Sequence, residues 1–115
     1  MTLLYGIKNC DSVKKARAWL NDQGYPHQFY DLRSGDLDLP TLDRWLEMTN
    51  SDILLNRRGT TWRNLDISIK KSVNQENIAK LLLSHPTLIK RPVLDHDGVL
   101  TVGFTPELYL TIFNH

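Results

Sequence analysis

Residues 2–24 read TLLYGIKNCDSVKKARAWLNDQG, and this stretch decides the fold. The apolar and aromatic run from Thr2 to Ile7 predicts a buried strand. From Ser12 to about Gln23 apolar side chains recur at helical spacing, and Gly24 is expected to end the helix. Asp11 or Ser12 is expected to cap its first turn. The apolar face carries Val13, Ala16, Trp19 and Leu20.

A second strand is predicted from His27 to Leu32, which completes a right-handed βαβ unit. Near the other end of the chain, Asp97-Gly98 separates two β-rich runs, Pro92 to Asp95 and Val99 to Val102, and this pattern predicts a hairpin. Thr105-Pro106 opens a last helix. Together these elements predict an α/β, thioredoxin-like fold with a mixed four-stranded sheet. The last helix is expected to point Leu108, Tyr109, Ile112 and Phe113 inward.

The middle of the chain predicts an inserted helical subdomain, about residues 35–85, within one domain that spans residues 1–115. Residues 57–65, RRGTTWRNL, are predicted to be a loop. The predicted helices of the insert are 40–48, Asp52–Asn56 and 74–84. The carboxylates interpreted as turn residues are Asp36, Asp38, Asp95 and Asp97.

The composition is that of an ordinary globular protein, with 41% hydrophobic and 23% charged residues and a net charge of +1. This balance gives no overall attraction to nucleic acid or to an anionic membrane. The first apolar run is too short for a signal peptide, and no segment reaches the roughly 20 apolar residues of a membrane span. We therefore expect a cytoplasmic monomer that contacts neither nucleic acid nor membrane.

Cys10 is the single cysteine, which excludes an internal disulfide and a zinc site built on several cysteines. A lone thiol suits a reducing cytoplasm. Its predicted position, between a strand and the start of a helix, offers free backbone N–H groups and a positive helix end. Such surroundings lower the pKa of a cysteine from ~8.5 to roughly 3.5–7.5, so Cys10 is a candidate nucleophile. The alternative is an inert cysteine that fills an apolar gap.

A two-cysteine redox motif would need a second thiol at residue 13, which is Val. If Cys10 forms a disulfide during turnover, the resolving thiol must come from another molecule, such as glutathione or a thiol protein. No bound cofactor or metal is expected, because the histidines share no metal-ligand spacing. His96, in the hairpin turn region, is expected to face solvent. The histidines are His27, His85, His96 and His115.

Three arginines are candidate anion ligands. Arg91 precedes Pro92 at the start of a predicted strand, where the X-Pro bond can be cis, and its planar guanidinium suits an oxyanion or a carboxylate. Arg57 and Arg58 precede a glycine and two threonines, which together can hold an anion. The alternatives are a solvated Lys90–Arg91 pair and a basic surface loop.

Three separated blocks resemble the arsenate reductase (ArsC)/Spx family. They are LYGIKNCDSVKKARAWL, LLNRRGTTWRNLD and HPTLIKRPVL, and a closing VGFTPE agrees as well. The resemblance covers essentially the whole chain and is closest to the YffB branch, a poorly characterised bacterial group. It implies a thioredoxin fold with an inserted helical subdomain, in which Cys10 is the nucleophilic thiolate.

The same resemblance implies further site residues. Arg91 matches the oxyanion-binding arginine before a cis proline, and Pro92 matches that proline. Arg58 matches a second arginine, with Arg57 as the alternative. The cysteine loop is expected to add substrate contacts from Lys8 and Asn9.

Two features depart from the glutaredoxin-coupled arsenate reductases that the chain resembles. Residues 101–104 lack the third arginine of those enzymes, and the cysteine loop lacks their Asn-Pro start. The predicted function is therefore a glutathione- or glutaredoxin-coupled thiol reductase, with glutathione as co-substrate and a mixed disulfide or small oxyanion as substrate. The alternatives are an arsenate reductase proper and an Spx-like, non-catalytic regulator that binds RNA polymerase, although a two-cysteine switch cannot operate with Cys10 alone.

Overall fold

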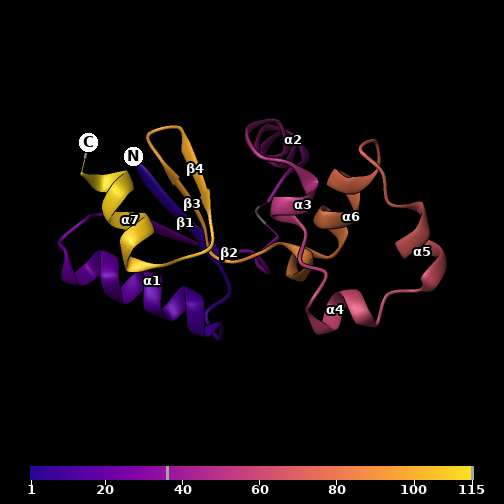
Figure 1. Ribbon diagram of the computed structural model, residues 1–115, viewed down its shortest axis with the longest axis horizontal. Coiled ribbons are helices and arrows are strands. Elements are labelled where there is room, and N and C mark those ends of the chain that lie inside the picture. Colours follow the sequence, from indigo (N-terminus) through magenta and orange to yellow (C-terminus); the bar gives the residue numbers. More distant parts are fainter. Residues whose placement is uncertain (36, 115) are drawn as a thin grey trace. The chain divides into compact units, whose positions relative to one another are not determined.

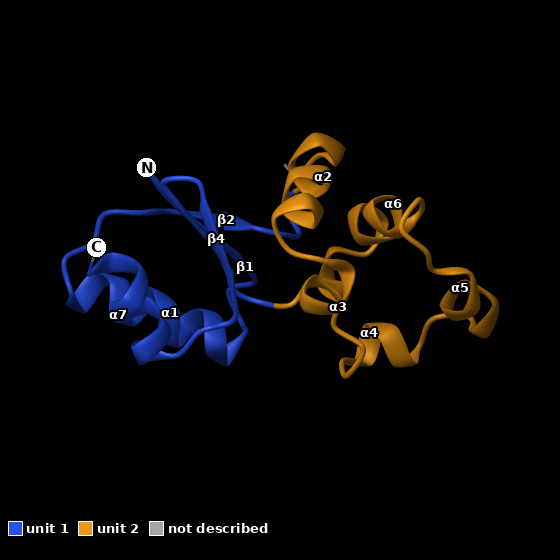
Figure 2. Ribbon diagram, turned by 45° about the horizontal axis from the view of Figure 1, so that its top comes forward, with its two compact units in different colours: residues 1–34, 91–115 blue, residues 35–90 orange. Residues whose placement is uncertain are grey.

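The computed structural model describes residues 1–35 and 37–114. The chain forms two compact units, coloured separately in Figure 2. The sheet unit is Met1–Ser34 with Arg91–His115, and the helical unit is Gly35–Lys90. The predictions made for Asp36 and His115 lie outside the described residues.

Four short strands make the sheet of the sheet unit (Figure 1). Their order is β2-β1-β3-β4, with β1 parallel to β2 and antiparallel to β3, which is antiparallel to β4. This arrangement confirms the predicted mixed four-stranded sheet and the α/β, thioredoxin-like class. The strands are β1 (Thr2–Gly6), β2 (Gln28–Asp31), β3 (Val93–His96) and β4 (Val99–Val102).

Asp97 and Gly98 close the β3–β4 hairpin, as predicted. Both have positive φ, 50° and 86°, which a two-residue turn matched to the strand twist requires. The prediction that Asp95 is a turn residue is wrong. Asp95 lies within β3, paired with Leu100, and only 8% of it is exposed.

His96 is half-buried, so the prediction that it faces solvent is wrong. It lies opposite Thr2 in the β1–β3 ladder, and its Nδ1 is 2.7 Å from the Thr2 hydroxyl oxygen. The Phe113 ring packs 4.4 Å from the imidazole, between ring centres. The last residue of β3 therefore faces the helices rather than the turn.

Helices α1 (Asp11–Asp22) and α7 (Pro106–Phe113) lie on the same side of the sheet (Figure 1). Tyr109 of α7 is fully buried, and Ile112 and Phe113 are partly buried against the same core, as predicted. Leu108 is instead 38% exposed, because each helical residue is turned ~100° from the next and Tyr109 takes the inward position. The fully buried core beneath the two helices is Leu4, Ala16, Leu20, Leu94 and Tyr109.

Gly24 ends α1, as predicted, with a φ of 75° that L side chains rarely adopt. The amide of Tyr25 donates to the carbonyl of Leu20, and the amide of Gly24 donates to the carbonyl of Asn21. These two bonds satisfy the last free carbonyls of the helix. The chain then turns into β2.

The helical unit consists of short helices around its own buried residues, which include Leu42 and Trp45 of the first helix and Leu82 of α6. The first helix starts after Asp38, whose carboxylate accepts from the amide of Thr41, so Asp38 caps a helix. Within the described residues, no helix of either unit is long and apolar enough to cross a bilayer. The elements are α2 (Leu39–Met48), α3 (Ser51–Leu54), α4 (Thr60–Arg63), α5 (Ile67–Ser72), α6 (Ile78–Ser84) and the 3₁₀ turn η1 (Pro86–Leu88).

Three features of this unit differ from what the sequence predicts. The stretch predicted as a loop, 57–65, contains α4, and α5 was not predicted. The helix expected from residue 74 begins only at Ile78, because the Asn74 side chain accepts from the amides of Glu76 and Asn77 and holds a turn there.

Candidate active site at the start of α1

Cys10 lies in a tight connection between β1 and α1. Its amide donates to the carbonyl of Ile7 at 3.1 Å, so that Lys8 and Asn9 form the middle of a turn. Cys10 is itself the N-cap of α1, with φ −89° and ψ 127°, and its carbonyl accepts from the amide of Lys14. The predicted caps, Asp11 and Ser12, are instead the first helical residues. The sulfur therefore occupies the place where a capping oxygen usually lies.

Gly6, at the end of β1, allows this connection. A Cβ atom at residue 6 would lie 2.6 Å from Cγ2 of Val13, which is buried in the first turn of α1. No real Cβ contact is so short, so only glycine lets the strand end pass this closely under α1. Sequence reasoning missed Gly6, because the clash partner is known only once the helix is placed.

Arg91 and Pro92 reach the same end of the sheet from the other side of β1. The register of the antiparallel pair sets Tyr5 opposite Val93, so residues 91 and 92 lie beside the end of β1 where the cysteine turn begins. The Arg91–Pro92 peptide bond is cis, and Pro92 is buried. The Pro92 carbonyl accepts from the amide of Gly103, which ties this corner to the end of β4.

The pKa of the Cys10 thiol is lowered below its ordinary value. Burial of the sulfur acts in the opposite direction and raises the pKa, since it disfavours the charged form. The Cys10 side chain makes no capping hydrogen bond in the structure. Three groups nevertheless favour the thiolate and together outweigh the effect of burial on the pKa: the amide of Val13, the guanidinium of Arg91 and the amide of Ser12. The half-buried sulfur with its lowered pKa is thus a candidate nucleophile.

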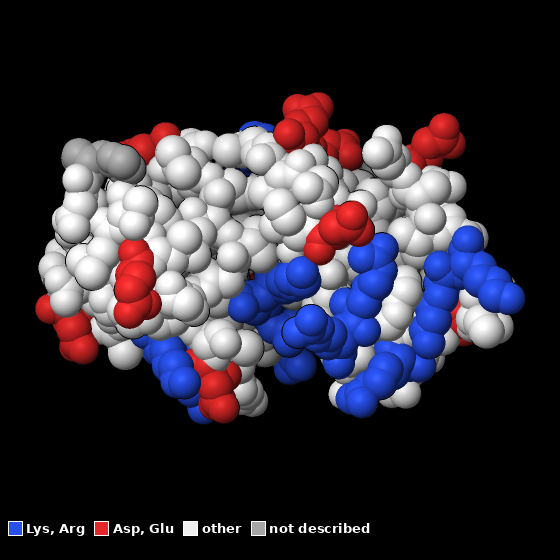
Figure 3. Space-filling model, viewed as in Figure 1, with Lys and Arg blue, Asp and Glu red and all other residues white. Residues whose placement is uncertain are grey.

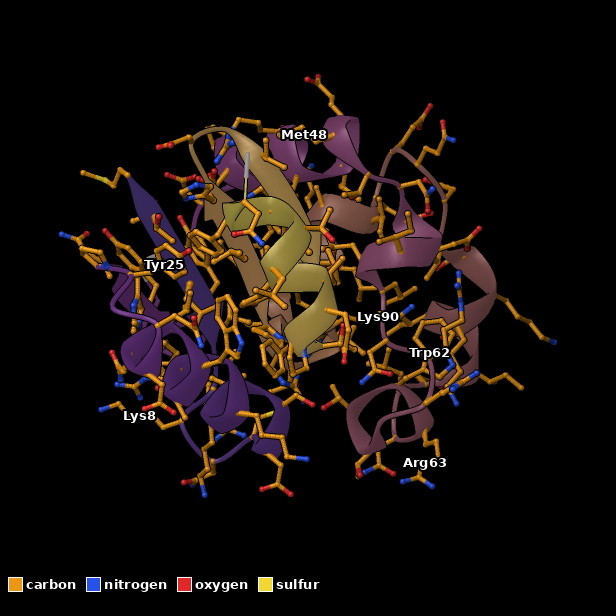
Figure 4. The ribbon with its side chains drawn as sticks, turned by 60° about the vertical axis from the view of Figure 1, so that its left-hand side comes forward. Lys8, Tyr25, Met48, Trp62, Arg63 and Lys90 are labelled. Atoms are coloured by element: carbon orange, nitrogen blue, oxygen red, sulfur yellow. The ribbon has the colours of Figure 1, made fainter. Side chains whose placement is uncertain are left out.

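The other residues predicted for the cysteine loop, Lys8 and Asn9, are exposed (Lys8 is labelled in Figure 4). Their backbone closes the turn that presents Cys10, and their side chains lie in solvent at the same turn. The sheet unit therefore brings five of the seven predicted site residues to one corner. They are Lys8, Asn9, Cys10, Arg91 and Pro92.

The two remaining predicted residues, Arg57 and Arg58, belong to the helical unit. Arg57 donates to the Asp52 carboxylate at 3.1 Å, and its guanidinium lies 5.5 Å from the Trp62 ring centre. Arg58 makes no ion pair with any of the residues that the structure describes. Both arginines line a hollow of about 280 Å³ together with Lys90. Among the described residues of this unit, Arg57 has an ion-pair partner and Arg58 has none.

The backbone around this hollow is fixed by residues distant in sequence. The amide of Asn56 donates to the carbonyl of Leu88, and the amide of Lys90 donates to the carbonyl of Leu54. The Lys90 ammonium donates to the carbonyl of Asp52 at 3.0 Å. The segment that carries Arg57 and Arg58 is therefore held by the residues that directly precede Arg91 in the chain.

The sequence profile of the ArsC family matches residues 5–112 of this chain. An uncharacterised protein of Haemophilus influenzae is 43% identical over 113 residues, which are 98% of this chain and 99% of that protein. Global transcriptional regulator Spx 1 of Oceanobacillus iheyensis is 29% identical, over 93% of this chain and 82% of that protein.

Solved structures agree with these sequence matches. The YFFB (PA3664) protein superposes with a TM-score of 0.91 at 40% identity, covering 96% of this chain and 97% of that one. An arsenate reductase (ArsC) related protein from Brucella melitensis has a TM-score of 0.76 at 45% identity, over 99% and 95% of the two chains. The fold, the family profile and the relatives lead to one conclusion: this chain belongs to the ArsC family.

Proposed function

We propose that this chain is a thiol reductase in which the Cys10 thiolate reduces a mixed disulfide between a substrate and glutathione. The observation that carries the proposal is the position of the sulfur at the N-cap of α1, where Arg91 and two amides lower its pKa although burial opposes them. A thiolate attacks a disulfide, whereas a thiol does not. With one cysteine in the chain, the second thiol must be external.

The reaction then has two exchange steps. The Cys10 thiolate attacks the glutathione sulfur of the mixed disulfide; a Cys10–glutathione disulfide forms, and the substrate leaves as a thiolate that takes a proton from water. The thiolate of a second glutathione, or of glutaredoxin, attacks the glutathione sulfur of this adduct and releases Cys10 as a thiolate. With glutathione, one mixed disulfide and one glutathione thiol give one substrate thiol and one glutathione disulfide.

The cations around the site suit this substrate. The planar guanidinium of Arg91 stabilises the thiolate and offers two parallel N–H groups to a carboxylate, and glutathione has two carboxylates. Lys8 and Asn9 are the proposed substrate contacts at the cysteine turn, and Arg58, in the helical unit, stays the second anion ligand that the family resemblance implies. A small oxyanion such as arsenate presents oxygens to the same groups, so arsenate reduction is the second chemistry to test.

The first test is the pH dependence of Cys10 alkylation by iodoacetamide. The thiolate exists above the folded-state pKa and is lost as pH falls through it, so the wild type should react at pH values where an ordinary thiol, near pKa ~8.5, is unreactive. In Arg91→Met the pKa should rise toward that of an ordinary thiol, since an opposite charge nearby is removed. The control Lys15→Met, at an exposed position of α1, should leave the profile unchanged. An ordinary pKa in the wild type would remove the basis of the proposal.

The second test measures glutathione-dependent reduction of a mixed disulfide of glutathione and 2-mercaptoethanol, against arsenate under the same coupled assay. Cys10→Ser should lose all activity, and Arg91→Met should lose about tenfold or more at neutral pH, in line with a weaker thiolate. Faster turnover of arsenate than of the disulfide would identify an arsenate reductase instead.

The competing candidate is a regulator that acts by binding, and its support is the similarity to Spx proteins over 93% of this chain. That similarity is 29% in identity. It predicts that a Cys10→Ser protein keeps its binding to RNA polymerase and that the wild type turns over neither substrate. Polymerase binding measured by co-purification, together with the assay above, separates the two functions.

A further inference from the structure

The charged residues of the helical unit are segregated by sign. Residues 55–90 carry seven Lys and Arg but only two acidic residues, Asp66 and Glu76, whereas residues 37–54 carry four acidic residues and one arginine. Figure 3 shows the Lys and Arg side chains gathered over the part of the molecule where Figure 1 places α4 and α5. The small net charge of +1 therefore conceals a basic surface on this unit.

Helix α5 is the unusual element of this surface, because none of its six residues is buried. Ile67 is 64% exposed and Ile69 is 36% exposed. A helix this short is unstable in water without packing, and here its contacts include the bond from the Lys70 ammonium to the Arg63 carbonyl at 3.1 Å. In Figure 4 the Arg63 side chain extends outward from the end of α4. Two aliphatic side chains are thus presented to solvent beside cations.

An open groove of about 290 Å³ lies next to α5, between it and α6. Its apolar lining comes from Ile69, Val73 and Leu81, and Lys80 and His85 stand among its polar residues. The α5 surface, as we name it, is this groove with Ile67, Lys70 and Lys71. The α5 surface thus combines apolar side chains that line the groove with lysine ammonium groups around it.

The cations of the α5 surface are not neutralised by the protein. Lys70, Lys71 and Lys80 form no ion pair with any residue in the described ranges 1–35 and 37–114. The nearest acidic residues in sequence are Asp66, which precedes α5, and Glu76, in the turn before α6, and both are exposed. Placed at the end of α5, Lys70 and Lys71 also meet the negative pole of that helix, which favours their position there.

We propose that the α5 surface docks an acidic, amphipathic segment of a partner protein, with the partner's aliphatic side chains in the groove and its carboxylates on Lys71 and Lys80. Charge complementarity selects an acidic ligand, and the exposed isoleucines select one that also offers apolar side chains. A nucleic acid fits less well, because single strands bind through aromatic platforms and the exposed apolar residues here are aliphatic. The proposal does not depend on Cys10.

The test is an unbiased one. A phage library of random 16-residue peptides is selected on the full-length wild type and counter-selected on Ile67→Ser/Lys71→Glu, whose substitutions are at exposed positions and should leave the far-UV circular dichroism unchanged. Enriched peptides should place Asp or Glu between aliphatic residues at helical spacing. Measured by fluorescence anisotropy, the best peptide should bind Ile67→Ser and Lys71→Glu each about tenfold more weakly. Lys15→Glu, on α1, is the matched charge control and should bind unchanged.

Other outcomes would overturn the proposal. Enrichment of peptides without acidic residues, or binding that survives both substitutions, would show that this surface does not select its ligand. A 20-nucleotide single-stranded RNA that binds as tightly as the best peptide, with loss in Lys71→Glu but not in Ile67→Ser, would show polyanion binding instead. Failure to enrich any peptide would also contradict it.

Discussion

The two units hold their functional side chains in different ways. In the sheet unit, Cys10 and Arg91 are fixed by the paired strands β1 and β3 and by a fully buried core under α1 and α7. In the helical unit the cations stand on short elements, and neither α4 nor α5 has a buried residue. A reacting atom needs a fixed position, whereas a docking surface needs charge and accessible apolar side chains. The rigid sheet unit holds the candidate nucleophile Cys10, and the exposed cations lie on the short helices of the helical unit.

Loss of core volume should produce the largest effect and should differ between the units. Leu4 and Leu82 are both fully buried, in the sheet and helical units respectively. Leu4→Ala should cost about 3–5 kcal/mol, because stiff aromatic rings surround its site and cannot collapse, while Leu82→Ala should cost about 2–3 kcal/mol. Urea unfolding followed by far-UV circular dichroism measures both. A larger cost for Leu82 would reverse the comparison.

The next prediction concerns the close approach of β1 to α1 at the candidate active site. Gly6→Ala should destabilise the protein by about 1–3 kcal/mol, since the new methyl group meets Val13 and must push α1 away from β1. The pKa of Cys10 should rise in the same variant, because the sulfur leaves the amides that stabilise it. Combining it with Val13→Ala should restore part of both losses. Purely additive effects in this double-mutant cycle would argue against the contact.

The next prediction is a substitution in the core of the sheet unit, at Tyr109, that should stabilise the protein. The Tyr109 hydroxyl is buried without a hydrogen-bond partner among the described residues, and burial raises its pKa. Tyr109→Phe removes this unsatisfied group and should stabilise the protein by about 1 kcal/mol. Tyr30→Phe, at a half-buried position of β2, serves as the control and should change stability by less than about 0.5 kcal/mol. A loss of stability in Tyr109→Phe would show that the hydroxyl has a partner.

The smallest effect is expected in the helical unit. The Arg57–Asp52 ion pair is largely exposed, and such pairs contribute little. Asp52→Asn should therefore change the free energy of unfolding by less than about 0.5 kcal/mol, measured in 0.1 M salt by urea titration. A change above about 1 kcal/mol would mean that surface charges stabilise the fold of the helical unit.

Much of the sheet unit was predictable from residue patterns. The strand–helix stretch around Cys10, the Asp97-Gly98 turn and the helix opened by Thr105-Pro106 carry local signals, and the structure confirms them. The cap at Cys10 was not predicted, because capping preferences favour Asp11 or Ser12 and a thiol is not among the usual capping side chains.

The helices of the helical unit were harder to predict from sequence, and the reason is physical. Helix α4 begins Thr-Thr-Trp and α5 reads ISIKKS, and β-branched, serine and aromatic residues have weak helix propensity. Tertiary contacts determine whether such segments become helical, and no local sequence pattern reveals those contacts. The same holds for Gly6, whose necessity depends on where Val13 lies, and for the meeting of Arg91 with Cys10, which depends on the register of β1 and β3.

That register has a consequence for the newly made chain. The guanidinium that favours the thiolate arrives with β3, whereas the sulfur is synthesised near the start of the protein. Until the C-terminal strands emerge from the ribosome and pair, residue 10 carries a thiol without its cationic neighbour. The pKa of Cys10 should therefore reach its lowered, folded-state value only after β3 has paired with β1.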